Sequence, residues 1–411
     1  MKILMINKFL YPNGGSETYM IELGKYFESL GYKVQYFGMF DERNILKNVA
    51  DSYANKIEFH SSIKNPFKLF NTFFETIYSK NARRKLKKVL IDFKPDIVHM
   101  NNINFQLTPS IIYELKKYKI PIVQTVHDVQ IACPCHRFYI EHKEEICTKC
   151  KEGAYYNCIL NKCVHNSMLK SFLASLESYY YHSRNTYNLV DSYICPSKFI
   201  AEQITNAGIK QEKITVLHNF SKKEKKLVIR DCSNKYALYF GRLSKEKGLE
   251  TILSIAKKLS NIKFVIAGNG PLEDKVIEIS SEYDNIEFVG FKTGIELQKL
   301  IINAAFSLYP SEWYENCPLS VIESIALGTP VIGSDLGGTK ELIANGKTGL
   351  IFEGCNNEQF SKAIQELWNN EELLVNMREQ CLQSNFNQID DYSNFIIKLY
   401  TKLIEERKYV K

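Results

Sequence analysis

The sequence has no run of 18 apolar residues, so we predict no membrane-spanning helix. Its first residues, MKILMINKFLYPNGG, lack the small-residue cleavage site of a signal peptide and instead predict a strand that enters a glycine loop. No group of histidines and carboxylates has the pattern of an open catalytic metal site, and no side chain is recognisable as a covalent nucleophile. We therefore expect a cytoplasmic protein whose chemistry needs no metal cofactor.

Length and hydrophobic content favour two folded cores. The chain has 411 residues, 45% of them hydrophobic, and single cores stop growing at about 250–300 residues. Short apolar runs alternate with helical patterns along nearly the whole chain, which is typical of parallel sheets built from βαβ units. The predicted fold class is α/β, with two Rossmann-like domains.

Charge is distributed unevenly along the chain. Residues 1–226 contain 33 lysines and arginines against 21 acids, a net +12, whereas residues 227–411 contain 20 against 25, a net −5. The change falls at the polar run 221–235, which follows a predicted strand at 214–217 and marks a linker. We expect an N-terminal domain at 1–220, a C-terminal domain at 236–388 and a final helical segment at 389–411.

The most informative segment is residues 310–335, PSEWYENCPLSVIESIALGTPVIGSD. Glu315 follows an apolar strand, and Glu323 lies about one turn inside a helix whose first turn is expected to hold Pro318. A helix start suits a phosphate, and a carboxylate can accept hydrogen bonds from two adjacent hydroxyls, as in ribose recognition. The amides are those of Leu319, Ser320 and Val321. Together these features predict a nucleotide-sugar site; the alternative is a pair of unrelated surface acids.

Two further strands end in glycine turns in the same half of the chain. Residues 236–240 predict a strand before Gly241-Arg242, and Lys247-Gly248 then open a helix. Because ligands of open α/β sheets bind at the carboxyl ends of strands, both cations suit a diphosphate. The alternative is a pair of surface cations near a helix start, which is an unfavourable place without an anion. Another strand enters the turn Gly268-Asn269-Gly270, where the backbone can approach a base or ribose closely.

These motifs resemble those of the retaining GT-B glycosyltransferases of family 4, a type found in bacterial cell-surface polysaccharide synthesis. The resemblance covers residues 310–335, the Gly337-Gly338 turn and the pattern G-R-L-x-x-x-K-G that starts at Gly241. It implies a GT-B fold, with two domains facing a central cleft and the last helix crossing back to the first domain. The site residues that it implies are Glu315 for the donor sugar, Glu323 for ribose, Arg242 and Lys247 for the diphosphate, with further donor contacts at Asn316, Pro318, Leu319, Ser320, Val321, Gly268, Asn269 and Gly270.

The first half offers weaker signals. Gly14 and Gly15 precede a helix for which Ser16 is a plausible N-cap, and they can receive a phosphate or an acceptor. His127 ends a strand at 120–126, and the resemblance implies that it reaches the donor sugar; a histidine satisfied at a strand terminus is the alternative. Polar residues at the ends of two strands are predicted to line the acceptor side. They are His99, Asn101 and Asn102 at the end of one strand and Asp128 at the end of the other, and a hydrogen-bonded turn explains the first three as well.

A cysteine-rich insertion at 133–165 follows His127. It holds six of the 11 cysteines, and the last four have the spacing C-x2-C-x7-C-x4-C, which suits a structural zinc site. The predicted ligands are Cys147, Cys150, Cys158 and Cys163, with His136, His142 and His165 as alternative ligands. The other interpretation is a set of small buried hydrophobic side chains, which is the usual state of a free cysteine.

Residues 66–93 predict an aromatic-rich helix, FKLFNTFFETIYSK, that runs into a basic segment, NARRKLKKVLIDF. Cations beside an exposed apolar stripe can hold a helix on an anionic membrane surface, and an ordinary solvated helix face is the alternative. The basic cluster of this segment contains Arg83, Arg84, Lys85, Lys87 and Lys88. No motif that reads nucleic acid accompanies it, so nucleic acid is not an expected partner.

The predicted function is transfer of a sugar from a nucleoside-diphosphate sugar to a hydroxyl of a glycan or lipid-linked acceptor, with retention. A nucleotide-sugar 2-epimerase shares the implied fold and is one alternative. A non-catalytic, zinc-stabilised protein that binds nucleotide sugars is the other, since fold alone does not fix function.

Overall fold

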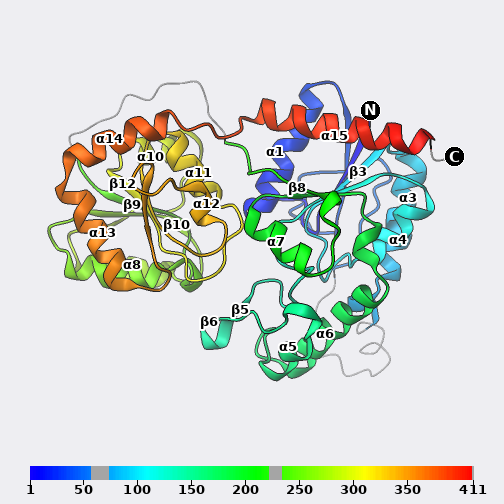
Figure 1. Cartoon of the computed structure of the whole chain (residues 1–411), viewed down its shortest axis with the longest axis horizontal. Coiled ribbons are helices and arrows are strands. Elements are labelled where there is room, and N and C mark those ends of the chain that lie inside the picture. The colour runs from blue at the N-terminus through cyan, green and yellow to red at the C-terminus, as the bar shows by residue number, and fades with distance from the viewer. Residues whose placement is uncertain (57–73, 222–233, 410–411) are drawn as a thin grey trace. The chain divides into compact units, whose positions relative to one another are not determined.

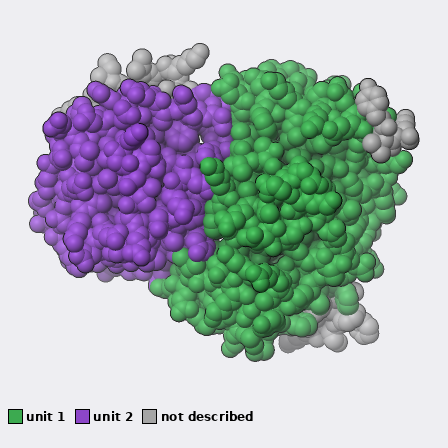
Figure 2. Space-filling model, viewed as in Figure 1, with its two compact units in different colours: residues 1–217, 389–411 green, residues 218–388 purple. Residues whose placement is uncertain are grey.

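The computed structural model describes residues 1–56, 74–221 and 234–409, and these form two compact units (Figures 1 and 2). One unit comprises Met1–Leu217 together with Ile389–Lys411, and the other comprises His218–Gln388. The predicted linker at 221–235 lies largely outside the described residues, as do residues 66–73 of the predicted aromatic-rich helix.

The first unit is built on a six-stranded parallel sheet. Its strands, in spatial order, are β2 (Lys33–Phe37), β1 (Lys2–Ile6), β3 (Ile97–Met100), β4 (Ile122–Thr125), β7 (Ser192–Cys195) and β8 (Ile214–Val216). Ile3, Leu4 and Met5 are fully buried although they point alternately to opposite faces of the sheet. Such a continuous apolar strand is stable only when both faces are covered. The helices of this unit include α1 (Gly15–Ser29), α3 (Lys80–Phe93), α4 (Ser110–Lys117), α5 (Tyr156–Leu160), α6 (Met168–Ser183) and α7 (Lys198–Asn206).

The second unit repeats this architecture. Its parallel strands, in spatial order, are β11 (Ile286–Phe288), β10 (Phe264–Asn269), β9 (Ala237–Arg242), β12 (Phe306–Tyr309), β13 (Val331–Ser334) and β14 (Gly349–Phe352). Its core contains the fully buried rings of Phe264, Phe306 and Phe360. The helices are α8 (Leu249–Lys258), α9 (Glu273–Glu282), α10 (Gly294–Asn303), α11 (Leu319–Ala326), α12 (Thr339–Leu342), α13 (Asn357–Asn369) and α14 (Glu371–Leu382). Two parallel Rossmann-like sheets confirm the predicted fold class.

Strand order gives each sheet a point at which the chain changes direction. In the second unit the chain runs from β9 outward to β10 and β11, then returns to β12 on the other side of β9. In the first unit the same change falls between β1 and β3. Open α/β sheets bind ligands outside the carboxyl ends of the strands at such points.

The last helix, α15 (Ile389–Tyr409), belongs to the first unit, as predicted (Figure 1). Near its start, the hydroxyl of Tyr392 lies 2.8 Å from that of Tyr19 in α1. Near its end, Arg407 donates a hydrogen bond of 3.0 Å to Asp191, just before β7. The helix is therefore joined to the first unit at both ends.

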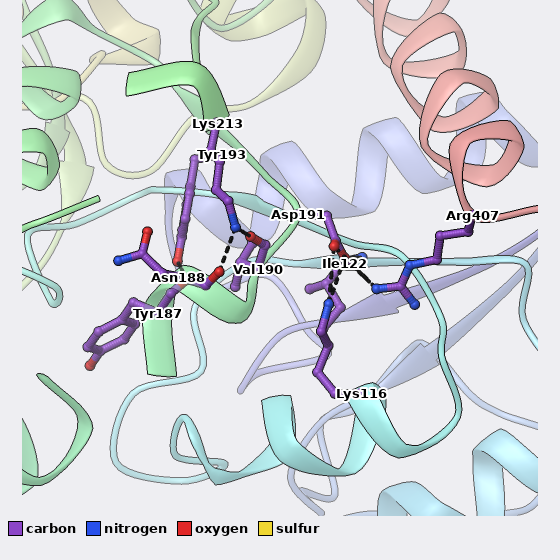
Figure 3. Close-up of polar contacts among 9 residues, drawn as sticks. All are labelled: Lys116, Ile122, Tyr187, Asn188, Val190, Asp191, Tyr193, Lys213 and Arg407. Atoms are coloured by element: carbon purple, nitrogen blue, oxygen red, sulfur yellow. Dashed lines mark hydrogen bonds and ion pairs between the residues drawn. The ribbon is translucent and has the colours of Figure 1, made fainter. Parts of the chain in front are cut away.

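Asp191 joins three elements of the first unit (Figure 3). Its carboxylate accepts from Arg407 of α15, from Lys116 of α4 at 3.1 Å and from the backbone N–H of Ile122, the first residue of β4, at 2.8 Å. Lys213, just before β8, donates to the backbone carbonyls of Asn188 and Val190, which precede Asp191 in the sequence. A partly buried carboxylate with two cations and an amide is a strong anchor, because hydrogen bonds to charged groups exceed neutral ones in strength.

We predict that Asp191→Asn lowers the free energy of unfolding by about 1–3 kcal/mol, since it weakens charged hydrogen bonds to both cations. Denaturant unfolding of the full chain measures this. Glu406→Gln is the matched control on the same helix, because the Glu406 side chain is mostly exposed and its pair with Lys402 spans 3.8 Å. Such exposed pairs contribute only about 0.2–1 kcal/mol. Equal effects of the two substitutions would contradict the anchoring role of Asp191.

Candidate active site

Lys247 and Glu315 meet at the carboxyl ends of β9 and β12, where the strand order of the second sheet reverses. Lys247 ends a short 3-10 turn, Lys245–Lys247, in the loop after β9, and Glu315 lies in the loop after β12. The two strands are neighbours in the sheet, so their carboxyl ends bring together residues that are 68 positions apart in the chain. The Lys247 Nζ lies 2.5 Å from Glu315 Oε1.

Glu315 is held by several donors. Its carboxylate also accepts from Ser311 Oγ at 2.8 Å and from Trp313 Nε1 at 2.5 Å, and only 8% of the residue is exposed. The Lys247 ammonium lies over the ring of Trp313, 5.3 Å from its centroid. Neither Ser311 nor Trp313 was predicted from the sequence as a partner of Glu315. The available signal was their place within four residues of Glu315 in the same loop.

Burial alone would raise the pKa of Glu315. The charge of Lys247 and the hydrogen bonds from Lys247, Trp313 and Ser311 outweigh that effect and hold the pKa below its usual value. The carboxylate is therefore ionised at neutral pH and cannot act as a proton donor there. An ionised carboxylate with a fixed orientation is suited to accept hydrogen bonds from sugar hydroxyls.

Two glycines are required for this geometry. Gly248 has φ +71°, and a Cβ at this position would lie 1.9 Å from the carbonyl oxygen of Pro310, at the start of the loop that carries Glu315. Gly268 has φ +149°, and a Cβ there would lie 1.9 Å from the carbonyl oxygen of Gly241. Only glycine allows such close approach of two backbones.

The same edge of the sheet carries other predicted donor contacts. The register of β10 against β9 pairs Gly268 with Gly241 and Asn269 with Arg242, and both Arg242 and Asn269 are exposed. Gly270 follows directly and packs on the backbone of Leu243. The structure thus brings Arg242, Gly268, Asn269 and Gly270 to the edge where Lys247 and Glu315 meet.

Helix α11 begins one residue later than expected. Pro318 has an extended conformation, with φ −66° and ψ +120°, and is the N-cap rather than a residue of the first turn, because the first bond within the helix runs from the N–H of Ile322 to its carbonyl. The amides of Leu319, Ser320 and Val321 consequently have no acceptor within the helix. Glu323 follows one turn later and is partly exposed, as is Asn316 before the helix.

The Gly337-Gly338 turn supports Glu315 from the next strand. The N–H of Gly338 donates to the carbonyl of Glu315 at 2.8 Å. Gly337 has φ +64°, and a Cβ there would lie 2.1 Å from the same carbonyl oxygen. The backbone of the site is therefore fixed from β13 as well as from β12.

In the first unit, His127 follows β4 and is partly exposed. Its Nε2 lies 2.9 Å from Oδ1 of Asn101, which follows β3, and its ring meets the ring of Tyr19 at 4.9 Å, edge to face. Burial lowers the pKa of His127 to about 3, so the imidazole is neutral at physiological pH. Asn101 is 1% exposed and contacts His127 rather than open solvent.

The loops after β1 and β3 form a second polar cluster. Asn7 accepts from the backbone N–H of Asn102 at 2.9 Å, and the side chain of Asn102 donates to Ser16 at 3.0 Å. Helix α1 begins at Gly15 with Gly14 as its N-cap, so the prediction of Ser16 as N-cap is wrong. The Ser16 hydroxyl is bonded to Glu17 and Asn102 instead. Gly14 and Gly15 are both exposed.

The acceptor-side predictions separate in the structure. Asp128 is partly exposed and accepts from Asn104 at 2.9 Å. His99 is fully buried, and its ring bonds to Thr125 and Tyr400. The prediction that His99 lines an acceptor site is therefore corrected, because β3 directs its side chain into the interior of the first unit.

The cysteine-rich insertion does not form the predicted zinc site. Over the described residues, no three His, Cys, Asp or Glu side chains are arranged to hold a metal ion. Cys150, Cys158 and Cys163 instead pack with Ile140 and Tyr155 in a small apolar cluster, and Cys147 lies at its margin. Burial is the main cause that raises the pKa of Cys150 to about 12, so this thiol is protonated at neutral pH. The geometry favours the alternative of small buried hydrophobic side chains.

One member of the basic cluster is already engaged. Arg83 pairs with Glu114 at 2.8 Å, stacks on Tyr78 and exposes only 16% of its side chain. Arg84, Lys87 and Lys88 are exposed and Lys85 is partly exposed, so membrane contact through these four residues stays a prediction. Among the helices that the structure describes, none is both long and apolar enough to cross a bilayer.

The chain matches two family descriptions that together span nearly its whole length. Residues 13–222 match Glycosyltransferase Family 4, and residues 220–383 match Glycosyl transferases group 1. A Klebsiella pneumoniae relative, an uncharacterized 42.6 kDa protein in the cps region, is 24% identical over 83% of this chain and 87% of its own length.

Two solved structures show the same fold. The lipopolysaccharide outer core galactosyltransferase WaaB has a TM-score of 0.63 and 19% identity, over 98% of this chain and 100% of its own. The Anabaena protein HepE in complex with UDP and glucose has a TM-score of 0.64 and 15% identity, over 98% and 100% of the two chains. The first family description alone covers more than half of the sequence, and the chain therefore belongs to the family 4 glycosyltransferases, with the GT-B fold.

Proposed function

We propose that this glycosyltransferase takes its sugar from a nucleoside-diphosphate sugar and transfers it to a hydroxyl group with retention at the anomeric carbon. The observation that carries the donor class is the contact of Lys247 with Glu315 beside the start of α11. A cation and free helix amides suit a diphosphate, and the fixed carboxylate suits the sugar hydroxyls next to it.

In the proposed reaction the bond between the anomeric carbon and the diphosphate oxygen breaks. The departing diphosphate gains negative charge, which Arg242, Lys247 and the N–H groups at the start of α11 stabilise without reorganisation. The acceptor oxygen bonds to the anomeric carbon on the same face, and its proton passes to the diphosphate. Glu315 and His127 orient the sugar ring, and Glu323 binds the ribose. Retention by this front-face route is an implication of the family resemblance.

Two side-chain cations and the helix amides take the place of a divalent cation in this proposal. Arg242 and Lys247 supply two charges at the carboxyl end of β9, and the α11 amides supply hydrogen bonds to phosphate oxygens. The chemistry of the proposed site is accordingly independent of metal.

The proposed product is a cell-surface polysaccharide or a glycolipid. The Klebsiella relative lies in a cps region, and one structural neighbour acts on the lipopolysaccharide outer core. The HepE complex contains UDP, which makes UDP-sugars the first donors to test. Both family descriptions name transferases, so neither the epimerase nor the non-catalytic alternative gains support.

A peripheral membrane position accompanies the proposal when the acceptor is lipid-linked. It depends on Arg84, Lys85, Lys87 and Lys88 at the surface of α3. Binding to anionic vesicles that weakens with salt is the expected behaviour, because such attraction is screened within a Debye length of about 8 Å at physiological ionic strength. Equal binding to neutral vesicles would contradict it.

We predict that Arg242→Ala and Lys247→Ala each reduce turnover by about 10²–10³-fold, because each removes charge stabilisation of the departing diphosphate. A panel of UDP-, GDP- and other nucleoside-diphosphate sugars, followed by release of the nucleotide, identifies the donor first. Lys258→Ala is the matched control, since Lys258 is an exposed cation at the end of α8 in the same unit. Unchanged turnover in a folded Arg242→Ala/Lys247→Ala protein would refute the donor-site assignment.

We also predict that a chelator such as EDTA changes neither turnover nor the melting temperature of protein purified under reducing conditions. The proposed chemistry uses protein cations, and the described thiols pack as apolar side chains. Loss of turnover would contradict metal-independent chemistry. A fall in melting temperature with turnover intact would instead restore a structural metal at the cysteine-rich insertion, because a structural metal contributes to folding free energy.

A further inference from the structure

A group of buried polar side chains lies between the last helix and His127 in the first unit. Apart from the partly exposed ring of His127, its members are at most 1% exposed, so each hydroxyl and ring nitrogen needs a partner within the protein. The members are Tyr19 on α1, His99 on β3, Asn101 after β3, Thr125 on β4, His127 after β4, and Tyr392 and Tyr400 on α15.

Five of these residues form a series of hydrogen bonds that begins and ends on α15. The hydroxyl of Tyr19 lies 2.8 Å from that of Tyr392 and 3.1 Å from Thr125 Oγ1. Thr125 Oγ1 also lies 2.7 Å from His99 Nε2, and His99 Nδ1 bonds to the hydroxyl of Tyr400. The two α15 tyrosines are therefore the ends of one continuous series of hydrogen bonds through α1, β4 and β3.

The series can be completed with a neutral His99 in either of its tautomers. Burial lowers the pKa of His99 to about 3, so the imidazole has one N–H and one acceptor nitrogen. If Nε2 carries the hydrogen, Tyr400 donates to Nδ1, His99 donates to Thr125, Thr125 to Tyr19 and Tyr19 to Tyr392. With the other tautomer every bond reverses. Each bond in the series has one hydrogen in either direction.

His127 is attached to this series through Tyr19. The ring of Tyr19 meets the imidazole edge to face at 4.9 Å and 67°, while Asn101 fixes Nε2 at 2.9 Å. The same Tyr19 ring meets the ring of Tyr392 at 5.8 Å and 88°. Tyr19 thus lies between His127 and the last helix, with contacts to both.

We propose that Tyr392 of α15 is a positioning residue for glycosyl transfer, which acts through the hydroxyl and ring of Tyr19 to fix the imidazole of His127. The inference rests on the proposed function, in which His127 orients the sugar. It assigns to α15 a second role besides stabilising the first unit. Small displacements of a group that orients the substrate lower turnover, because transition-state geometry is strict.

The test is a double-mutant cycle of Tyr392→Phe and His127→Ala, with kcat and KM for the donor measured for all four proteins. Tyr392→Phe keeps the ring and removes one hydroxyl, and we expect kcat to fall on the order of 3- to 10-fold with KM unchanged. In the His127→Ala background the same substitution should have no further effect on kcat, because its route of action is gone.

A matched control is Tyr26→Phe, which removes the contact of the Tyr26 hydroxyl on α1 with Asp390 of α15, outside the series of hydrogen bonds through Tyr19. We expect kcat of Tyr26→Phe to equal that of the unmodified protein. Tyr19→Phe serves as a second variant if Tyr392→Phe does not fold, and the same pattern in the cycle is expected of it.

Three results would overturn the inference. Equal losses of kcat from Tyr392→Phe with and without His127 would show a purely structural role. Unchanged kcat in Tyr392→Phe would show no role. Full turnover in His127→Ala would remove the proposed part of His127 itself, and the other three proteins distinguish that failure from a failure of the positioning role.

Discussion

The contact between Lys247 and Glu315 is the constraint on which the organisation of the second unit depends. It forms only because β9 and β12 are neighbours, although two strands intervene between them along the chain. Gly248 lets the loop after β9 pass against Pro310, and Gly337 lets the next loop pass against Glu315. Ser311 and Trp313 donate to the same oxygen of the carboxylate as Lys247, Oε1. A site held in this way needs little rearrangement when charge develops on a ligand.

The first unit has the same sheet architecture as the second, but its interior contains buried polar groups that need hydrogen-bond partners. Its buried polar groups form one series of hydrogen bonds, and α15 supplies both ends of it. Asp191 anchors the far end of that helix to α4 and β4. A buried polar series is favourable only when every member is paired, and the neutral state of His99 permits this. The helix that closes the chain therefore also orders the interior beneath His127.

The sequence predicted the elements better than the environments of their side chains. The strand at 97–100 and the last helix were located closely, because buried parallel strands are short apolar runs and a long helix has a clear period. The grouping of Arg242, Gly268, Lys247 and Glu315 followed from motifs. The burial of His99, the donors Ser311 and Trp313, and the packing of the insertion thiols did not, since these depend on which strands become neighbours. Pro318 was predicted in the first turn of its helix and is the N-cap, and Ser16 was predicted as an N-cap and lies two residues after the N-cap Gly14. Local propensity does not decide positions at this scale.

Amide hydrogen exchange of the full chain with and without UDP tests the central claim most directly. Amides at the start of α11, from Leu319 to Val321, have no acceptor within the helix, and the turns at 241–248 and 268–270 lie at the same edge of the sheet. If this edge binds the nucleoside diphosphate, UDP slows exchange in these three segments and has its largest effect there. If the protein turns over UDP-sugars but UDP protects none of these three segments, the donor site lies elsewhere and the proposed site is wrong.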